Sequence, residues 1–87
     1  MMIRSKKLFE KQFKKLPKNL QAKALQKIEI FSKTPMDKSL KNHALQGKLK
    51  GLRAFSVTGD VRIIFQEVDG YVIVLFIAIG SHSQLYE

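Results

Sequence analysis

The first third of the chain repeats apolar residues every three or four positions and fills the remaining positions largely with lysine. From Ser5, a candidate cap, to Leu16, this period predicts an amphipathic helix. Its apolar side is formed by Leu8, Phe9, Phe13 and Leu16. A second helix is predicted from Asn19, again a candidate cap, to about Lys33, and Pro17 separates the two. We expect a helical hairpin whose apolar stripe faces a sheet.

The second half of the chain has the pattern of strands and turns. A short edge strand is predicted at Met2 to Arg4, before the helices. Three further strands are predicted over residues 52–58, 61–68 and 71–79. Thr58-Gly59 and Asp69-Gly70 are the predicted turns between them, and residues 36–50 have no clean period and are predicted to form a loop. The order β-α-α-β-β-β indicates an α+β fold, a small antiparallel sheet with the helical hairpin packed on one face.

The two faces of the strand predicted over residues 61–68 carry different side chains. Val61, Ile63 and Phe65 point one way, and Arg62, Ile64 and Gln66 point the other. Because the wholly apolar set must meet the helices, we expect Arg62 on the sheet face that the helices leave uncovered.

Charge divides the chain into two unlike parts. Sixteen Lys and Arg against seven Asp and Glu give a formal net charge of +9. Residues 1–53 carry fifteen of the basic and three of the acidic side chains, a net of +12, whereas residues 54–87 have a net of −3. A basic segment of this density indicates a polyanionic partner, either nucleic acid or an acidic protein.

Composition excludes several other classes of site. The chain has no cysteine, which rules out disulfides and thiolate metal sites, and its two histidines are 39 positions apart. The longest apolar run, Tyr71 to Ile79, is about half of what a membrane helix needs, and the N-terminus has no apolar signal segment. We expect one domain over residues 1–87, located in the cytoplasm, without a metal or a small-molecule cofactor.

The last apolar strand is followed by a polar tail that contains His82, one of the two histidines. Together with this tail, IGSHSQLY, the segments HALQGKLKGLR and TGDVRIIFQ resemble the RelE/ParE superfamily of bacterial toxins, and most closely its YafQ group of messenger-RNA interferases. The resemblance covers nearly the whole chain. It implies a type II toxin that cleaves messenger RNA in the decoding site of the ribosome and is silenced by an antitoxin. The expected partners are therefore an acidic cognate antitoxin, the ribosome and messenger RNA.

The resemblance also implies which positions form the catalytic site. They are His43, Asp60, Arg62, His82 and Tyr86. Arg62 matches the strand arginine that many RelE-type enzymes use against the scissile phosphate, and His82 matches their C-terminal histidine. Two positions depart from the pattern: Ser56 replaces a further histidine and Val61 replaces a tryptophan.

Cleavage of RNA without a metal, through attack of the 2′-hydroxyl on phosphorus, requires a base, a cation and an acid. His82 is the candidate acid, because imidazole exchanges a proton near neutral pH, and His43 is the candidate base. Arg62 offers a fork that matches phosphate oxygens. Asp60 could orient an imidazole or take a proton, and Tyr86 could stack on a base. The basic loop residues Lys48, Lys50 and Arg53 are expected to hold phosphates of ribosomal RNA.

Other interpretations of these residues remain open from sequence. His82 could be an ordinary exposed terminal histidine, and Asp60 an ordinary turn residue after Gly59. A ParE-like module that poisons DNA gyrase by binding, or a degenerate member that only binds its antitoxin, would share the fold. The histidines and Asp60 favour the nuclease, because a binding poison needs no proton carriers.

Overall fold

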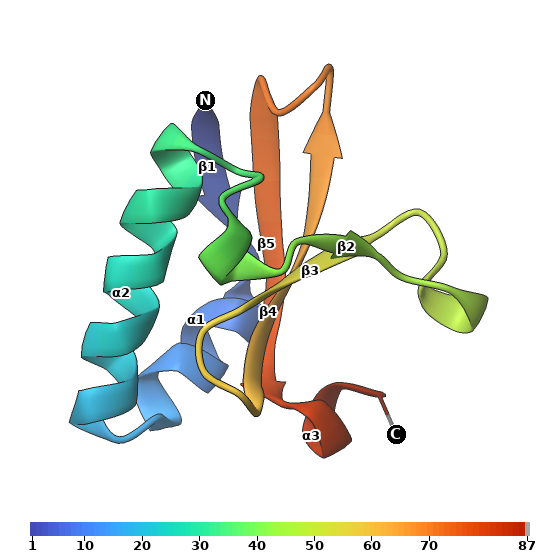
Figure 1. Cartoon of the computed structure of the whole chain (residues 1–87). Helices are drawn as coiled ribbons and strands as arrows, with labels where there is room; N and C mark the ends of the chain where they lie inside the picture. Colours follow the sequence, from blue (N-terminus) through green and yellow to red (C-terminus); the bar gives the residue numbers. More distant parts are fainter. Residues whose placement is uncertain (87) are drawn as a thin grey trace.

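A five-stranded sheet, with two helices on one of its faces, forms the body of the molecule in the computed structural model, which describes residues 1–86 (Figure 1). The strand order is β1-β5-β4-β3-β2. The strands are β1 (Met2–Ser5), β2 (His43–Ala44), β3 (Arg53–Ser56), β4 (Val61–Val68) and β5 (Ile73–Ser81). The predicted α+β class and helical hairpin are confirmed. The sheet is mixed rather than wholly antiparallel, because the edge strand β1 runs parallel to β5.

The two long helices are α1 (Lys7–Lys15) and α2 (Lys18–Lys33), and both begin at other residues than predicted. Ser5 is not the cap of α1. It belongs to β1, and the amide of Lys6 still donates to the carbonyl of Phe76, at 2.9 Å, so sheet pairing delays the start of the helix. Asn19 lies inside α2, whose first turn closes on the carbonyl of Pro17.

The main core lies between these helices and the sheet and is built around aromatic rings. Phe31 of α2 is fully buried, and its ring centroid lies 4.5 Å from that of Phe55 and 4.9 Å from that of Phe65. Phe9 of α1 packs on Phe76 at 5.3 Å. Leu8, predicted on the apolar side of the first helix, is instead 52% exposed, because α1 presents Phe9 and Phe13 to the sheet.

The alternation predicted along β4 is confirmed. Val61, Ile63 and Phe65 belong to the core under the helices, whereas Ile64 belongs to a smaller cluster on the opposite face. We call this opposite face, which α1 and α2 do not cover, the second face. Cross-strand pairing assigns it the side chains of His43, Ala54, Ser56, Arg62 and Ile64, with Gly80 opposite Arg62.

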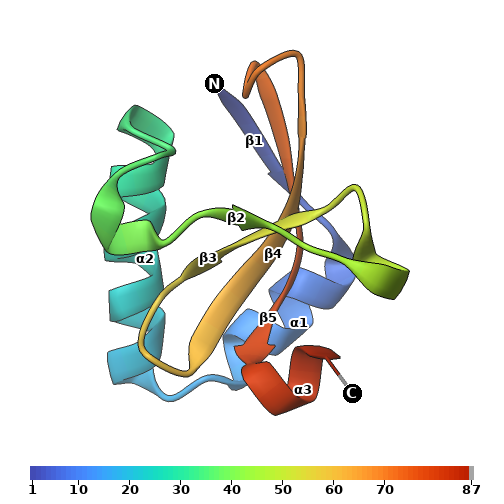
Figure 2. The same cartoon turned by 45° about the vertical axis from the view of Figure 1, so that its right-hand side comes forward.

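Residues 36–50 are not the simple loop that was predicted. They contain the 3₁₀ helices η1 (Lys38–Leu40) and η2 (Gly47–Leu49), with β2 between them. Leu40 of η1 is fully buried. The segment with η2 lies on the opposite side of the molecule from α2 (Figures 1 and 2). A strand of two residues is too short to leave a period in the sequence.

The C-terminal end of the sheet differs from prediction in a way that matters for the site. The turn after β4 spans residues 69–72 rather than two residues, and β5 runs two positions further than predicted. The polar tail then forms a short helix, α3 (His82–Tyr86), whose residues Leu85 and Tyr86 pack on the second face. The tail is therefore part of the folded surface.

Candidate active site

Two of the predicted site residues hold buried polar atoms that have no partner. Among residues 1–86, Nη1 of Arg62 and the hydroxyl of Tyr86 are the side-chain atoms that are buried and make no hydrogen bond. The two groups are close enough for the charge of Arg62 to act on the Tyr86 phenol, although burial is the stronger effect and raises its pKa. An unsatisfied buried donor costs about 1–3 kcal/mol, so this arrangement favours an acceptor that arrives from outside.

His82 is the first residue of α3, and Asp60 holds its backbone. The His82 amide donates to the carbonyl of Asp60 at 3.1 Å and approaches the Asp60 carboxylate oxygen Oδ1 at 3.4 Å. The exposed imidazole lies with its centroid 4.6 Å from that of the Tyr86 ring. Asp60, Arg62, His82 and Tyr86 are thus brought together where β4 begins and α3 follows β5.

A capping box that the sequence interpretation missed holds α3 in this place. The amide of Ser81 donates to Oε1 of Gln84 at 2.9 Å, and the amide of Gln84 donates to Oγ of Ser81 at 3.2 Å. The spacing Ser-x-x-Gln is the sequence signature of this motif and could have revealed the helix. Gly80, directly opposite Arg62 in the sheet, leaves room for the Gln84 side chain, since a Cβ there would lie 2.8 Å from Oε1.

His43 lies on the same face, on the far side of β3 from Arg62. His43 belongs to β2 and pairs with Ala54 of β3, whereas Arg62 pairs with Ser56, the next position of β3 on that face. Nδ1 of His43 lies 2.9 Å from the carbonyl oxygen of Lys41. A carbonyl only accepts, so Nδ1 carries the hydrogen, and in the neutral ring Nε2 keeps a lone pair. The exposed ring is therefore in the tautomer that a base requires.

The remaining predicted residues are spread over the molecule. Lys48 and Lys50 are exposed in and beside η2. Arg53 pairs with Phe65 in the sheet and donates from Nε to Oδ1 of Asn42 at 2.9 Å, so it lies on the face opposite to Arg62. The structure does not bring Arg53 to the catalytic candidates.

The two positions that depart from the YafQ pattern have different surroundings. Ser56 lies beside Arg62 in the sheet and is buried, so it occupies the second face with a short hydroxyl instead of an imidazole. Val61 is buried in the core under the helices. A valine at position 61 therefore presents no surface to the second face.

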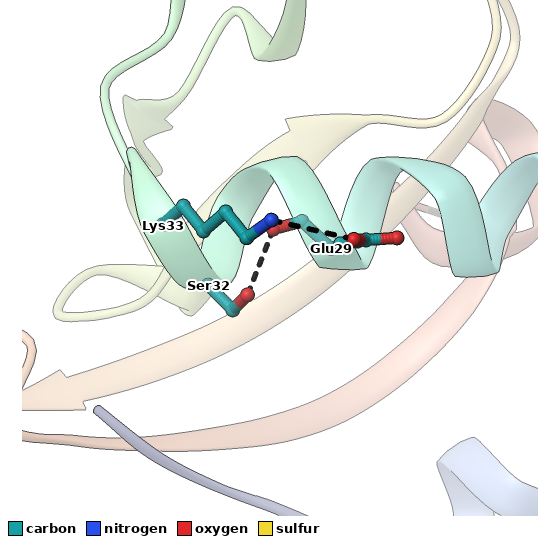
Figure 3. A network of polar contacts seen from close by, with 3 residues as sticks. All are labelled: Glu29, Ser32 and Lys33. Atoms are coloured by element: carbon teal, nitrogen blue, oxygen red, sulfur yellow. Dashed lines mark hydrogen bonds and ion pairs between the residues drawn. The ribbon is translucent and has the colours of Figure 1, made fainter.

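The basic charge of the molecule is poorly compensated by its carboxylates. Within residues 1–86, one ion pair is formed, between the exposed side chains of Lys33 and Glu29 of α2 at 3.4 Å, next to a hydrogen bond from Ser32 to the Glu29 carbonyl (Figure 3). In the same part of the chain no group of three His, Cys, Asp or Glu side chains could hold a metal ion. No helix there is long and apolar enough to cross a membrane.

Comparison with protein families places these features in a known context. The family model described as a bacterial toxin of type II toxin-antitoxin system, YafQ, matches residues 1–87. None of the curated proteins matches the chain significantly.

Solved structures agree with this match over nearly the whole chain. The crystal structure of YafQ from E. coli strain BL21(DE3) has a TM-score of 0.74 and 26% identity, with 98% of this chain and 97% of that chain covered. YafQ in the E. coli DinJ-YafQ complex has a TM-score of 0.72 and 27% identity, at 98% and 97% coverage. A conserved hypothetical protein of Helicobacter pylori has a TM-score of 0.68 and 29% identity, with 99% of both chains covered.

Proposed function

The chain belongs to the YafQ family of type II toxin-antitoxin toxins, and from this premise we propose that it is a ribosome-dependent endoribonuclease that cleaves messenger RNA without a metal ion. The observation that carries the proposal is the unpaired Nη1 of Arg62, buried next to Tyr86 on the second face. A guanidinium held there without an acceptor is suited to a phosphate oxygen. His82 and His43 supply a proton carrier on either side of it.

In the proposed reaction the 2′-oxygen of the RNA attacks the neighbouring phosphorus while its proton passes to Nε2 of His43. Arg62 donates to the phosphate oxygen on which negative charge grows. The bond from phosphorus to the 5′-oxygen breaks, and the imidazolium of His82 gives its proton to that oxygen. The products are a 2′,3′-cyclic phosphate and a 5′-hydroxyl end, and both histidines then exchange protons with water.

The openness of the site supports the proposed dependence on the ribosome. Both imidazoles are exposed, so the protein alone encloses the RNA poorly. A ribosome would hold the messenger in a bent geometry, and positioning of this kind is worth several kcal/mol of barrier. The exposed lysines Lys48 and Lys50 would then contact phosphates of ribosomal RNA.

The proposed partner in the resting cell is an acidic antitoxin. E. coli YafQ, a structural relative, is found in complex with DinJ. A net charge of +9 would speed the association of an acidic partner, and neutralisation of that charge by the bound partner would then oppose binding of RNA. The antitoxin, the messenger RNA and the ribosome would all meet this protein in the cytoplasm.

The test is cleavage of a messenger RNA by purified protein, with and without ribosomes. Wild-type protein should cut inside translated codons only when ribosomes are present, and the new ends should be 2′,3′-cyclic phosphate and 5′-hydroxyl. Arg62→Ala should lose most of this activity, whereas the exposed α1 control Lys14→Ala should keep it. Equal cleavage of naked RNA would contradict the ribosome dependence.

Expression in growing cells separates the two rival functions. The proposal expects growth arrest together with messenger-RNA ends in codons. Growth arrest with gyrase-dependent DNA breaks and intact messenger RNA would identify a ParE-like poison instead. Absence of any growth effect would identify a member that only binds its antitoxin.

A further inference from the structure

A basic hollow lies next to Arg62, on the side away from His82. It has a volume of about 270 Å³ and opens between α2, the end of η1 and the turn after β3. Its cations are Lys23 and Lys27 of α2, Lys41 and Arg62. Ser56 and Thr58 add hydroxyl groups to its wall. None of the residues that line it, all within the described part of the chain, is acidic.

The charges of this hollow are compensated only in part. Lys27 reaches the carbonyl of Ser39 at 3.5 Å and lies close enough to Asp37 to contribute to the low pKa of that carboxyl. The main causes of that low pKa, however, are the hydroxyl and amide of Ser39, which bind the Asp37 carboxylate at 2.7 and 2.9 Å. The two nearby carboxylates, Asp37 and Asp60, do not line the hollow, and two carboxylates against four cations still leave a positive excess, which favours an anion.

The hydroxyl groups fit an anion with several acceptor oxygens. Oγ1 of Thr58 already accepts the amides of Asp60 and Val61, at 3.3 and 3.0 Å. Its own hydrogen therefore remains to be donated. Cationic ammonium groups combined with hydroxyl donors suit the oxygens of a phosphate.

The hollow shares one residue with the proposed catalytic site and includes the residue that holds the His43 ring. Arg62 belongs to both, and the carbonyl of Lys41 accepts the hydrogen bond from His43. We propose that the hollow is a second phosphate subsite, which holds a non-reacting phosphate of the RNA chain beside the scissile phosphate at Arg62. Since His43 would take the proton of the 2′-hydroxyl, the phosphate in the hollow is the one on the 5′ side of the cleaved bond. This inference rests on the proposed function.

The test is binding of short RNA to the free protein, which needs neither ribosomes nor catalysis. The probes are a dinucleotide and a trinucleotide of 2′-O-methyladenosine without terminal phosphates, which carry one and two phosphodiesters and cannot be cleaved. Affinities come from NMR titration at low salt. The wild type should bind the trinucleotide about fivefold to tenfold more tightly. A neutral methylphosphonate at the 5′-side phosphate should remove this gain.

A matched pair of variants tests whether the tighter binding of the trinucleotide arises in the hollow. Lys23→Gln/Lys27→Gln removes two charges four residues apart on α2, and Lys7→Gln/Lys11→Gln removes two exposed charges at the same spacing on α1. The α2 variant should lose the preference for the trinucleotide, and the α1 variant should keep it. Equal losses in both variants, or an unchanged preference in the α2 variant, would overturn the subsite.

The outcomes also separate this inference from the proposed function. If Arg62→Ala abolishes ribosomal cleavage but the α2 variant binds both probes like the wild type, only the subsite is wrong. If the α2 variant keeps the trinucleotide preference and loses antitoxin binding, the hollow is a docking site for an acidic protein segment, which also overturns the subsite. If the preference is lost as expected while the wild type cleaves no RNA on ribosomes, the phosphate subsite stands and the nuclease proposal fails.

Discussion

The amide of His82 donates a hydrogen bond of 3.1 Å to the backbone carbonyl of Asp60, which joins the turn before β4 to the first residue of α3. The main chain of Asp60, more than its carboxylate, therefore positions the candidate acid, because the carboxylate contact is longer, at 3.4 Å. Substitution of the aspartate side chain leaves the carbonyl in place. The two residues should consequently differ in how much their substitution costs.

We expect His82→Ala to slow ribosomal cleavage by about 10²–10⁴-fold, the usual contribution of a positioned acid. Asp60→Ala should slow it by roughly tenfold or less, since the backbone bond to His82 remains. Single-turnover cleavage rates on ribosomes measure both. Both variants should keep the thermal midpoint of the wild type within a few degrees. A loss in Asp60→Ala as large as that in His82→Ala would show that the carboxylate takes part in the chemistry.

Gly80→Ala should damage the site through the tail helix. The new Cβ would lie 2.8 Å from Oε1 of Gln84, so the end of this side chain must shift, which weakens its hydrogen bond with the Ser81 amide. We expect a loss of about 1 kcal/mol of unfolding free energy and a roughly tenfold or greater loss of cleavage. Gly59→Ala is the control for stability, because a Cβ at Gly59 meets nothing within 4 Å. Wild-type cleavage by Gly80→Ala would mean that the capping box does not position His82.

Tyr86→Phe should leave stability at neutral pH unchanged or raise it by up to about 1 kcal/mol, because it removes a buried hydroxyl that has no partner. Burial raises the pKa of the Tyr86 phenol above its ordinary value near 10.0. The folded protein then keeps the phenolic proton where the unfolded chain loses it, so this contribution to stability falls as pH rises above about 10.

Urea unfolding of the wild type and Tyr86→Phe between pH 7 and 11 checks this prediction. The wild type should lose stability relative to the variant only at the alkaline end. The difference between the two proteins cancels the titration of groups that they share. A constant difference across the whole range would contradict a raised pKa of Tyr86.

Phe31→Ala should lower the unfolding free energy by about 3–5 kcal/mol. Phe31 is fully buried and contacts rings from three strands, so no single neighbour can fill the space that it leaves. Leu25→Ala, on the same helix but 58% exposed, should change stability by no more than about 0.5 kcal/mol. Denaturant unfolding of the two variants measures these changes. Similar losses of unfolding free energy in both variants would show that Leu25 is covered in solution.

The sequence alone was sufficient for the features that depend on local periodicity. The bounds of β4 and the faces of its side chains agree with the prediction, including the position of Arg62 away from the helices. The helical hairpin and the edge position of β1 also agree. The faces of β4 and the helical hairpin follow from local periodicity, of two residues in the strand and 3.6 in the helices, which each segment carries within itself.

The tertiary structure decided what depends on contacts between distant segments. Pairing of Lys6 with Phe76 set the start of α1, and the bond from His82 to Asp60 fixed the place of the tail. The parallel direction of β1, the short strand at His43 and the isolation of Arg53 from Arg62 likewise arise from pairing partners. Local periodicity states which face a residue takes but not which strand lies beside it, because long-range hydrogen bonds select the neighbour.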